Sequence, residues 1–160
     1  MDASLQAVGL LVSLALAYAA AGLGSVATRR GLRAWYPALR KPSWTPSGRV
    51  IGAVWTVLYA LMAVAAWLVW REAGWAPVPL LLYLAQLVLN VAWSFAFFAA
   101  RAPGAAFVVI VALGLGVAAT GLAFLGESRL AAALLVPYLA WVAFAGWLNL
   151  SIWRLQRSPR

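Results

Sequence analysis

The residues best suited to chemistry in this chain are tryptophans and amides. Ten tryptophans occur among 160 residues, and there is no cysteine and no histidine. These absences exclude a thiolate nucleophile, a disulfide framework, a Cys/His zinc site and His-ligated haem, so we expect no metal site. A Ser/His/Asp set and a phosphate-binding loop are also missing, and ordinary hydrolytic or phosphoryl-transfer chemistry therefore lacks its residues.

Helical spacing gathers these side chains on shared faces. In the segment 77–100, one polar and aromatic face contains Gln86, Asn90, Trp93, Ser94 and Phe97. Two other segments carry aromatic faces, formed by Trp55, Tyr59 and Met62 and by Trp141, Ala145 and Leu148. Because an amide is costly in lipid, Gln86 and Asn90 should face protein. Two interpretations stay open: an aromatic core in which amides join the helices, or the walls of a ligand cavity.

The elements that position these faces are transmembrane helices. The chain is 66% hydrophobic and 9% charged, whereas soluble domains carry about 25% charged residues. Each of five apolar runs is long enough to cross a hydrocarbon core of roughly 30 Å, and unpaired strands are excluded from lipid. The runs cover residues 5–27, 50–70, 77–100, 104–125 and 130–153. We predict an all-α integral membrane protein in which residues 1–160 form a single five-helix transmembrane domain.

The first run could instead be a signal peptide. Its flank, Met1 to Ser4, carries no positive charge, and its apolar length exceeds that of a typical signal-peptide core. We therefore expect it to be retained as a helix.

The basic residues orient the predicted helices. Only Arg71 and Arg129 lie on one side of the membrane, whereas the other side holds Arg29, Arg30, Arg33, Arg40, Lys41, Arg49, Arg101, Arg154, Arg157 and Arg160. By the positive-inside rule the N-terminus lies outside and the C-terminus lies in the cytoplasm. The net charge of +9 is thus assigned to topology and lipid headgroups. We expect no nucleic-acid partner.

The first joint, residues 28–48, is longer than a connector needs to be. It combines Trp35, Tyr36 and Trp44 with three prolines and five of the twelve basic residues. Two interpretations stay open: a lid over the cytoplasmic mouth of the bundle, or an anchor in the membrane interface.

The spans lack the groups that carriers and channels use. No carboxylate lies inside any span, which disfavours a proton-coupled carrier, and the chain lacks the charge rings or carbonyl filter of an ion pore. The fourth run offers small residues for close helix packing, either inside the bundle or across a dimer. They are Ala112, Gly114, Gly116, Ala118 and Gly121.

Four segments resemble one known family. Residues 35–46 read Trp-Tyr-Pro-Ala-Leu-Arg-Lys-Pro-Ser-Trp-Thr-Pro, which resembles the first-loop signature of the TspO/translocator-protein family, also called tryptophan-rich sensory proteins or peripheral benzodiazepine receptors. The resemblance continues through residues 55–59, from Gln86 to Ser94, and from Pro137 to Asn149. It spans nearly the whole chain in consistent order, and the chain is identified as similar to bacterial members.

The resemblance implies a five-helix bundle, usually a homodimer, that binds porphyrins such as protoporphyrin IX, haem-related tetrapyrroles, sterols and synthetic isoquinoline or benzodiazepine ligands. It implies a pocket that opens toward the first loop and no required cofactor beyond such a tetrapyrrole ligand. Matched by position, the implied ligand-binding residues are Tyr36, Pro46, Ile51, Trp55, Tyr59, Asn90, Trp93, Trp141, Phe144, Ala145 and Leu148.

Some bacterial members promote light- and oxygen-dependent breakdown of protoporphyrin, and the tryptophans implicated there match Trp55 and Trp141. Animal members carry a sterol motif on the fifth helix, but its tyrosine position is Leu150 here, so sterol binding is not expected. Three hypotheses follow: a tetrapyrrole receptor or sensor linked to transport or stress regulation, a light-dependent porphyrin-degrading enzyme, and a membrane scaffold without a small ligand.

Overall fold

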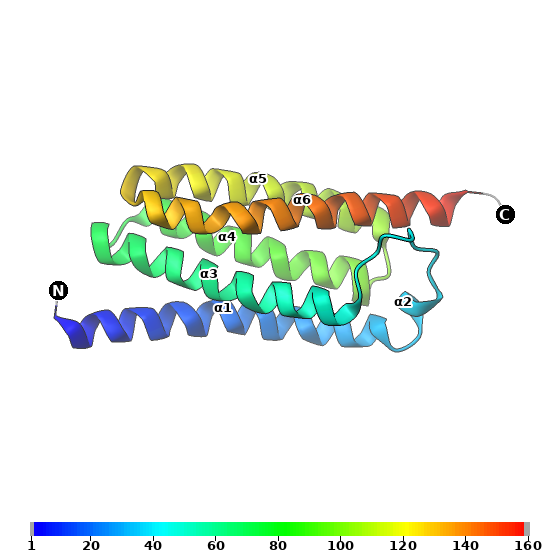
Figure 1. Ribbon diagram of the computed structural model, residues 1–160, viewed down its shortest axis with the longest axis horizontal. Coiled ribbons are helices and arrows are strands. Elements are labelled where there is room, and N and C mark those ends of the chain that lie inside the picture. The colour runs from blue at the N-terminus through cyan, green and yellow to red at the C-terminus, as the bar shows by residue number, and fades with distance from the viewer. Residues whose placement is uncertain (1, 159–160) are drawn as a thin grey trace.

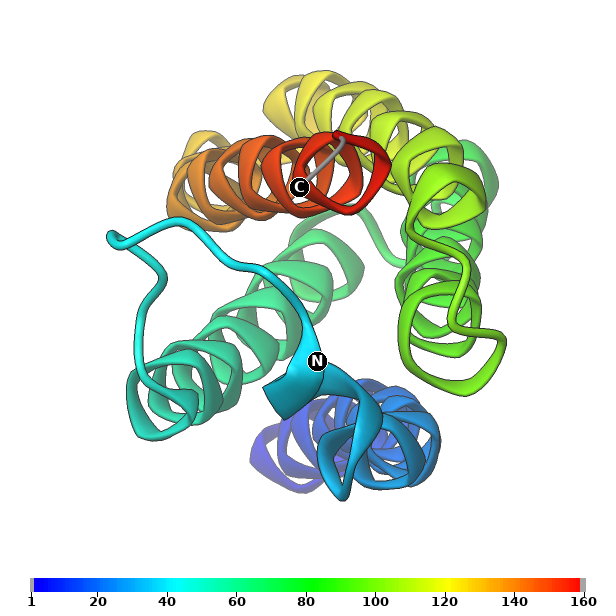
Figure 2. The same cartoon turned by 90° about the vertical axis from the view of Figure 1, so that its right-hand side faces the viewer.

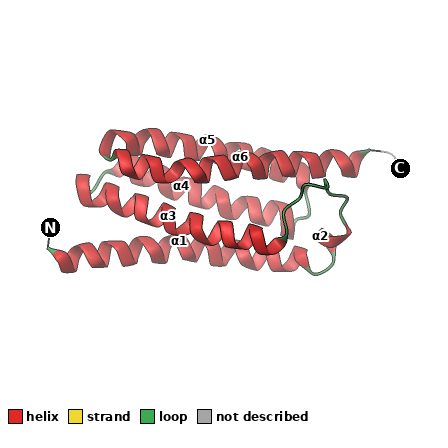
Figure 3. Cartoon of the chain, viewed as in Figure 1, coloured by secondary structure: helices red, strands yellow, loops and turns green. Residues whose placement is uncertain are grey.

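The computed structural model describes residues 2–158 as a bundle of long helices (Figure 1). In chain order these are α1 (Ala3–Leu32), α2 (Trp35–Ala38), α3 (Gly48–Ala73), α4 (Pro77–Ser94), the π-helical turn η1 (Phe95–Ala99), α5 (Pro103–Glu127) and α6 (Arg129–Arg157). Five helices are long and apolar enough to cross a membrane, with α4 and η1 together forming one span. Residues 2–158 contain no strand (Figure 3). The predicted all-α, five-helix fold is confirmed.

Local capping chemistry sets the ends of the helices. The Asp2 carboxylate accepts a hydrogen bond from the Leu5 N–H at 2.8 Å, which caps α1 and lowers the pKa of Asp2. Ser47 and Ser128 cap α3 and α6 in the same way. The end of α3 is Gly74 at φ +68°, a left-handed conformation that glycine adopts without steric cost.

The observed helices differ from the predicted runs at their ends. α1, α3 and α6 extend beyond residues 5–27, 50–70 and 130–153, because polar first and last turns remain helical outside the hydrocarbon. The run 77–100 is not one uniform α-helix. After Ser94 the chain forms a π-turn, in which the Ala100 N–H donates to the Phe95 carbonyl at 2.8 Å.

The five spans form a closed ring in the order α1, α3, α6, α5, α4 (Figure 2). α4 packs along α5, and α5 packs along α6, as their short connections predict. α3 and α4 also follow one another closely in sequence, but they barely touch, because α3 packs between α1 and α6. This order brings α1 beside α4 and α3 beside α6, two pairs of helices that are not consecutive in the sequence.

Small residues let α1 lie against the end of α4. A Cβ added at Gly31 would lie 2.8 Å from the Phe98 carbonyl oxygen, and one added at Gly24 would lie 3.1 Å from the Ser94 hydroxyl. α1 therefore approaches α4 and η1 more closely than larger side chains would permit.

The small residues of α5 point in more than one direction. A Cβ at Gly116 would meet Gln86 of α4 at 3.5 Å, and one at Gly114 would meet Val142 of α6 at 3.8 Å. These two glycines thus serve packing inside the bundle. Gly121 has no atom within 4 Å of such a Cβ, and a dimer through this face stays a prediction.

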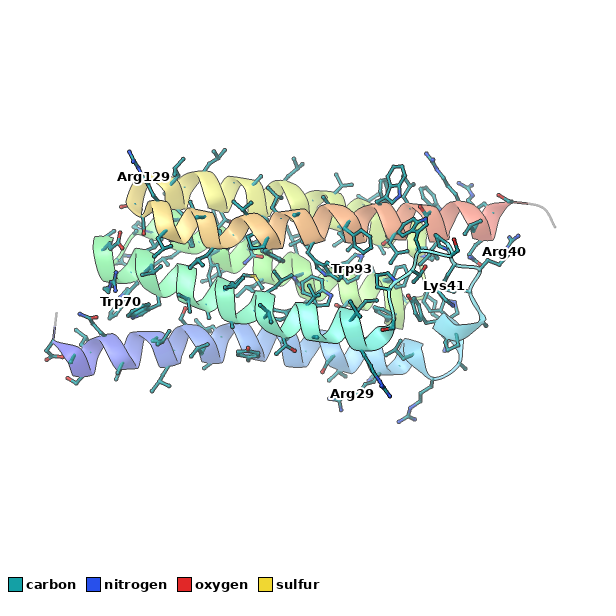
Figure 4. The ribbon with its side chains drawn as sticks, viewed as in Figure 1. Arg29, Arg40, Lys41, Trp70, Trp93 and Arg129 are labelled. Atoms are coloured by element: carbon teal, nitrogen blue, oxygen red, sulfur yellow. The ribbon has the colours of Figure 1, made fainter. Side chains whose placement is uncertain are left out.

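Basic side chains gather at one end of the bundle. Arg29, Arg40 and Lys41 lie at the end that carries α2, and Arg129 lies at the opposite end (Figure 4). Arg160, counted in the charge bias, lies outside the described residues. The predicted orientation, with the α2 end in the cytoplasm, stays a prediction.

Candidate ligand-binding cavity

A cavity of about 460 Å³ occupies the interior of the ring at the α2 end. α1, α3, α4 with η1, and α6 all contribute to its walls, whereas no residue of α5 does. Most of its lining is apolar, and its volume lies in the range of small-molecule sites. The arrangement is therefore suited to hold an apolar molecule.

Ten of the eleven predicted ligand-binding residues line this cavity. They are Tyr36, Ile51, Trp55, Tyr59, Asn90, Trp93, Trp141, Phe144, Ala145 and Leu148. Pro46 is not among the lining residues. The fold thus brings together side chains from four separate segments, and their role in ligand binding stays a prediction.

Trp55 lies at the centre of the aromatic wall. Its ring centroid is 5.8 Å from that of Tyr59, 6.3 Å from that of Trp93 and 6.1 Å from that of Tyr138. Trp141 packs separately against Phe144 at 5.2 Å. The two predicted reactive tryptophans therefore belong to two different aromatic groups of one cavity.

A directional chain of hydrogen bonds lies behind the aromatic wall. The Tyr59 hydroxyl donates to Asn90 Oδ1, Asn90 Nδ2 donates to the Tyr138 hydroxyl, and that hydroxyl donates to Gln86 Oε1, each at 2.8 Å. Gln86 Nε2 lies 3.9 Å from Met62 Sδ. The chain joins α3, α4 and α6 through side chains that are nearly or fully buried. The prediction that Gln86 and Asn90 face protein is confirmed.

The indole groups of the cavity are held in different ways. Trp93 Nε1 donates to Asn149 Oδ1 at 3.0 Å, and Asn149 Nδ2 donates in turn to the Pro103 carbonyl at 2.7 Å. The Trp141 Nε1–H is buried and has no hydrogen-bond partner among the described residues. Trp93 is thus fixed in orientation by a hydrogen bond, whereas Trp141 is held by packing alone. Trp147, on the same helix as Trp141, is 62% exposed and faces out of the bundle.

Sequence reasoning missed the contribution of α1 and of Asn149. Asn149 follows Leu148 and lies four residues after Ala145, so helical spacing alone could have placed it on the cavity face. On α1, the lining residues are Tyr18, Ala21, Gly24, Ser25, Thr28, Arg29 and Leu32. Their three- and four-residue spacing is a helical signal, but small side chains give it little contrast.

The π-turn η1 shapes the end of the cavity that lies near α2. It carries Phe97 and Phe98, both of which line the cavity and lie 4.9 Å apart. Tyr36 of α2 packs against both rings, at 6.2 Å and 5.6 Å. Partial burial raises the pKa of the Tyr36 phenol above its ordinary value, which keeps this group neutral.

The first joint is hydrogen-bonded within itself and to the end of α6. Lys41 Nζ donates to the carbonyls of Tyr36, Pro37 and Leu39 at 2.8 to 3.2 Å, all within the joint. Gln156 of α6 donates to the Arg40 carbonyl at 2.8 Å. Figure 2 shows the segment passing from α1 near the end of α6 to α3. The contacts suit both a lid and an anchor, and both interpretations stay open.

The fold and the cavity define the class: a five-helix integral membrane protein with an aromatic cavity at one end. A sequence profile of the TspO/MBR family matches residues 11–154, and the chain belongs to this family, as the resemblance predicted.

Individual relatives agree. The chain is 49% identical to the human translocator protein over 128 residues, which cover 78% of this chain and 75% of that protein. It is 39% identical to the tryptophan-rich protein TspO of Chlorobaculum tepidum over 163 residues, with coverages of 99% and 100%. It is 36% identical to protein CrtK of Rhodobacter capsulatus over 130 residues, with coverages of 79% and 81%.

Two buried tyrosines give a matched test of the hydrogen-bond chain. Tyr138→Phe removes a hydroxyl with two partners and leaves buried groups of Asn90 and Gln86 unpaired, so the free energy of unfolding should fall by about 1–3 kcal/mol. Tyr83→Phe removes a buried hydroxyl that has no hydrogen-bond partner among residues 2–158, and should change stability by less than about 0.5 kcal/mol. Unfolding in mixed micelles, followed by circular dichroism, measures both. Equal losses would contradict the role given to the chain.

Proposed function

We propose that this protein is a membrane receptor or sensor that binds tetrapyrroles, protoporphyrin IX or a haem-related molecule, in the aromatic cavity. The observation that carries the proposal is the lining itself: Trp55, Trp93 and Trp141 surround one apolar space. A porphyrin is a large flat π-system that gains both stacking and apolar burial between such rings. Coupling of this binding to transport or to stress regulation is part of the same proposal.

Arg29 supplies the polar end of the proposed site. It is the one charged residue among those described as lining the cavity, and it makes no ion pair within the described residues. Protoporphyrin IX carries two carboxylates on one edge of an otherwise apolar ring. With the ring between the tryptophans, a carboxylate at the cavity mouth would lie within reach of the exposed guanidinium.

Arg29→Gln should therefore weaken protoporphyrin binding by about two- to fivefold, the range of an exposed ion pair. The same variant should bind the dimethyl ester of protoporphyrin as the unaltered protein does, because the ester has no carboxylate. Arg30→Gln is the control, since Arg30 is the adjacent exposed arginine and does not line the cavity. Quenching of tryptophan fluorescence by added porphyrin gives the dissociation constants.

The quenching titration also tests the proposal as a whole. A scaffold without a small ligand, the third hypothesis, predicts no saturable quenching at all. Saturable quenching that survives replacement of Trp55, Trp93 and Trp141 together would place the porphyrin elsewhere on the protein.

A second candidate function is light-dependent degradation of the bound porphyrin. It is favoured by the placement of Trp55 and Trp141 on two walls of the same cavity. A photoexcited porphyrin can accept one electron from an adjacent indole, which leaves an indole radical cation and a porphyrin radical anion. Dioxygen then forms a C–O bond to the reduced ring, and the adduct returns one electron to the indole radical cation. The net change is addition of O2 to the porphyrin, with the indole regenerated. This chemistry requires no His, Cys or metal.

Illumination in air tests the enzymatic candidate. With protoporphyrin bound, the unaltered protein should lose porphyrin absorbance faster than free porphyrin does, and the Trp55→Phe/Trp141→Phe double variant should lose this acceleration. Phenylalanine preserves apolar contact but is a much poorer electron donor. An undiminished rate in a double variant that still binds porphyrin would contradict the proposed role.

The proposal also includes a homodimeric assembly and an orientation in the membrane. The family resemblance supports a homodimer, and the concentration of arginine at the α2 end supports a cytoplasmic location for that end. On this basis the cavity mouth and the C-terminus face the cytoplasm, and the N-terminus lies outside.

A further inference from the structure

The cavity is closed where α4, η1 and α6 form its wall, and it is open between α1 and α3. Lining residues from α4, η1 and α6, such as Asn90, Phe97 and Leu148, are buried. By contrast, the facing parts of α1 and α3 contribute lining residues that are also exposed on the outside of the bundle. These are Tyr18, Arg29, Leu32, Gly48, Gly52 and Thr56. The cavity therefore opens sideways, through a slit between residues 18–32 of α1 and residues 48–56 of α3.

The slit lies at membrane depth. Tyr18 is near the middle of α1, which runs from Ala3 to Leu32, so the slit extends from about mid-bilayer to the α2 end. Large apolar side chains beside it point outward, with Leu23 and Val57 each 58% exposed. On a transmembrane helix such surfaces contact acyl chains. The slit thus faces lipid along most of its length.

Hydrogen bonds join α1 to α3 only at the closed end of the slit and beyond that end, toward the N-terminus of α1. Trp67 Nε1 donates to the Gln6 carbonyl at 3.0 Å, Ser13 donates to the Ala63 carbonyl at 2.7 Å, and Tyr18 donates to the Thr56 carbonyl at 3.0 Å. Between residues 19–32 and α3, no hydrogen bond occurs in the described part of the chain. The Tyr18 bond is therefore the last hydrogen bond between the two helices toward the α2 end, and beyond it they are held by packing alone.

The slit surface suits an apolar molecule. Its hydroxyl groups bond to backbone carbonyls: Ser25 to Gly22, Thr28 to Gly24 and Thr56 to Gly52, at 2.8 to 3.0 Å. No hydroxyl donor is left unpaired there to hold water or to oppose an apolar solute. A Cβ added at Gly52 would meet no atom within 4 Å, so the space beside this residue is unfilled.

We infer that this slit is the route by which an apolar ligand passes between the acyl-chain region of the bilayer and the cavity, with Tyr18 at its closed end. The inference rests on the proposed function in one respect, that the cavity takes an apolar ligand. The rival route, through the first joint, is obstructed where Arg40 is hydrogen-bonded to Gln156 of α6 and to the Ser158 carbonyl. Access from the lipid also matches a ligand that partitions into membranes.

The absence of cysteine allows a test that uses no porphyrin. Ala145→Cys places a single thiol in the cavity, and Leu122→Cys places one on the lipid face of α5, where Leu122 is 73% exposed. Both are labelled in vesicles with N-pyrenylmaleimide, which partitions into the bilayer. The lipid-face thiol reports the reagent concentration in the membrane, and a charged water-soluble maleimide measures access from the aqueous side.

Gly52→Phe fills the slit and should slow labelling of the cavity thiol roughly tenfold without changing labelling of the lipid-face thiol. Gly121→Phe is the matched control, because a Cβ there also meets no atom within 4 Å and the residue lies on α5, away from the cavity. Tyr18→Phe removes this last hydrogen bond between α1 and α3 and should speed labelling roughly threefold. This second variant keeps the test decisive if Gly52→Phe does not fold.

The inference would be overturned in favour of the first joint if the labelling rate were unchanged in both slit variants but higher in Gln156→Ala. It would also be overturned if the charged maleimide labelled the cavity thiol faster than N-pyrenylmaleimide does. A porphyrin titration of the unaltered, unlabelled protein in the same kind of vesicle separates the two claims. Slit-dependent labelling without saturable porphyrin binding would contradict the proposed function and leave the route supported.

Discussion

The chain of hydrogen bonds from Tyr59 through Asn90 and Tyr138 to Gln86 is the constraint on which the rest of the structure depends. In a bilayer, water cannot serve as the hydrogen-bond partner of a buried amide or phenol, so each such group needs a partner in the protein. Here the donors and acceptors match in one direction across α3, α4 and α6. Satisfying them fixes the relative rotation of three helices, and with it the positions of Trp55 and Trp93.

The same constraint explains why the cavity has one firm side and one loose side. α4 and α6 are joined by buried polar contacts, including the Asn149 bridge between Trp93 and the start of α5. α1 contributes small residues and hydroxyls that bond within their own helix, so it packs closely but is joined to α3 only up to Tyr18. The aromatic wall formed by α4 and α6 is therefore held by hydrogen bonds, whereas the facing wall of α1 and α3 is held mainly by packing. A site for a large flat molecule needs both kinds of wall, because the ring must be bound firmly and must also be able to enter.

Much of this arrangement could be predicted from the sequence, because the physical signals were strong. Bilayer length and apolar composition determine the five spans, and the cost of amides in lipid places Gln86 and Asn90 inside. The aromatic residues of the cavity were reached through the family resemblance as well as helical spacing. The contribution of α1 could not be predicted, because glycine, alanine and serine give a weak periodic signal on an otherwise apolar helix. The π-turn after Ser94 and the ring order, in which α3 leaves α4 to pack between α1 and α6, depend on tertiary contacts that no local pattern specifies.

We propose above that the aromatic cavity is a tetrapyrrole site. A structure of the protein determined in lipid with protoporphyrin IX bound would test this proposal. We expect the ring between Trp55, Trp93 and Trp141, with its carboxylate edge toward Arg29. A porphyrin found only on the outer lipid-facing surface, with the cavity unoccupied, would contradict it.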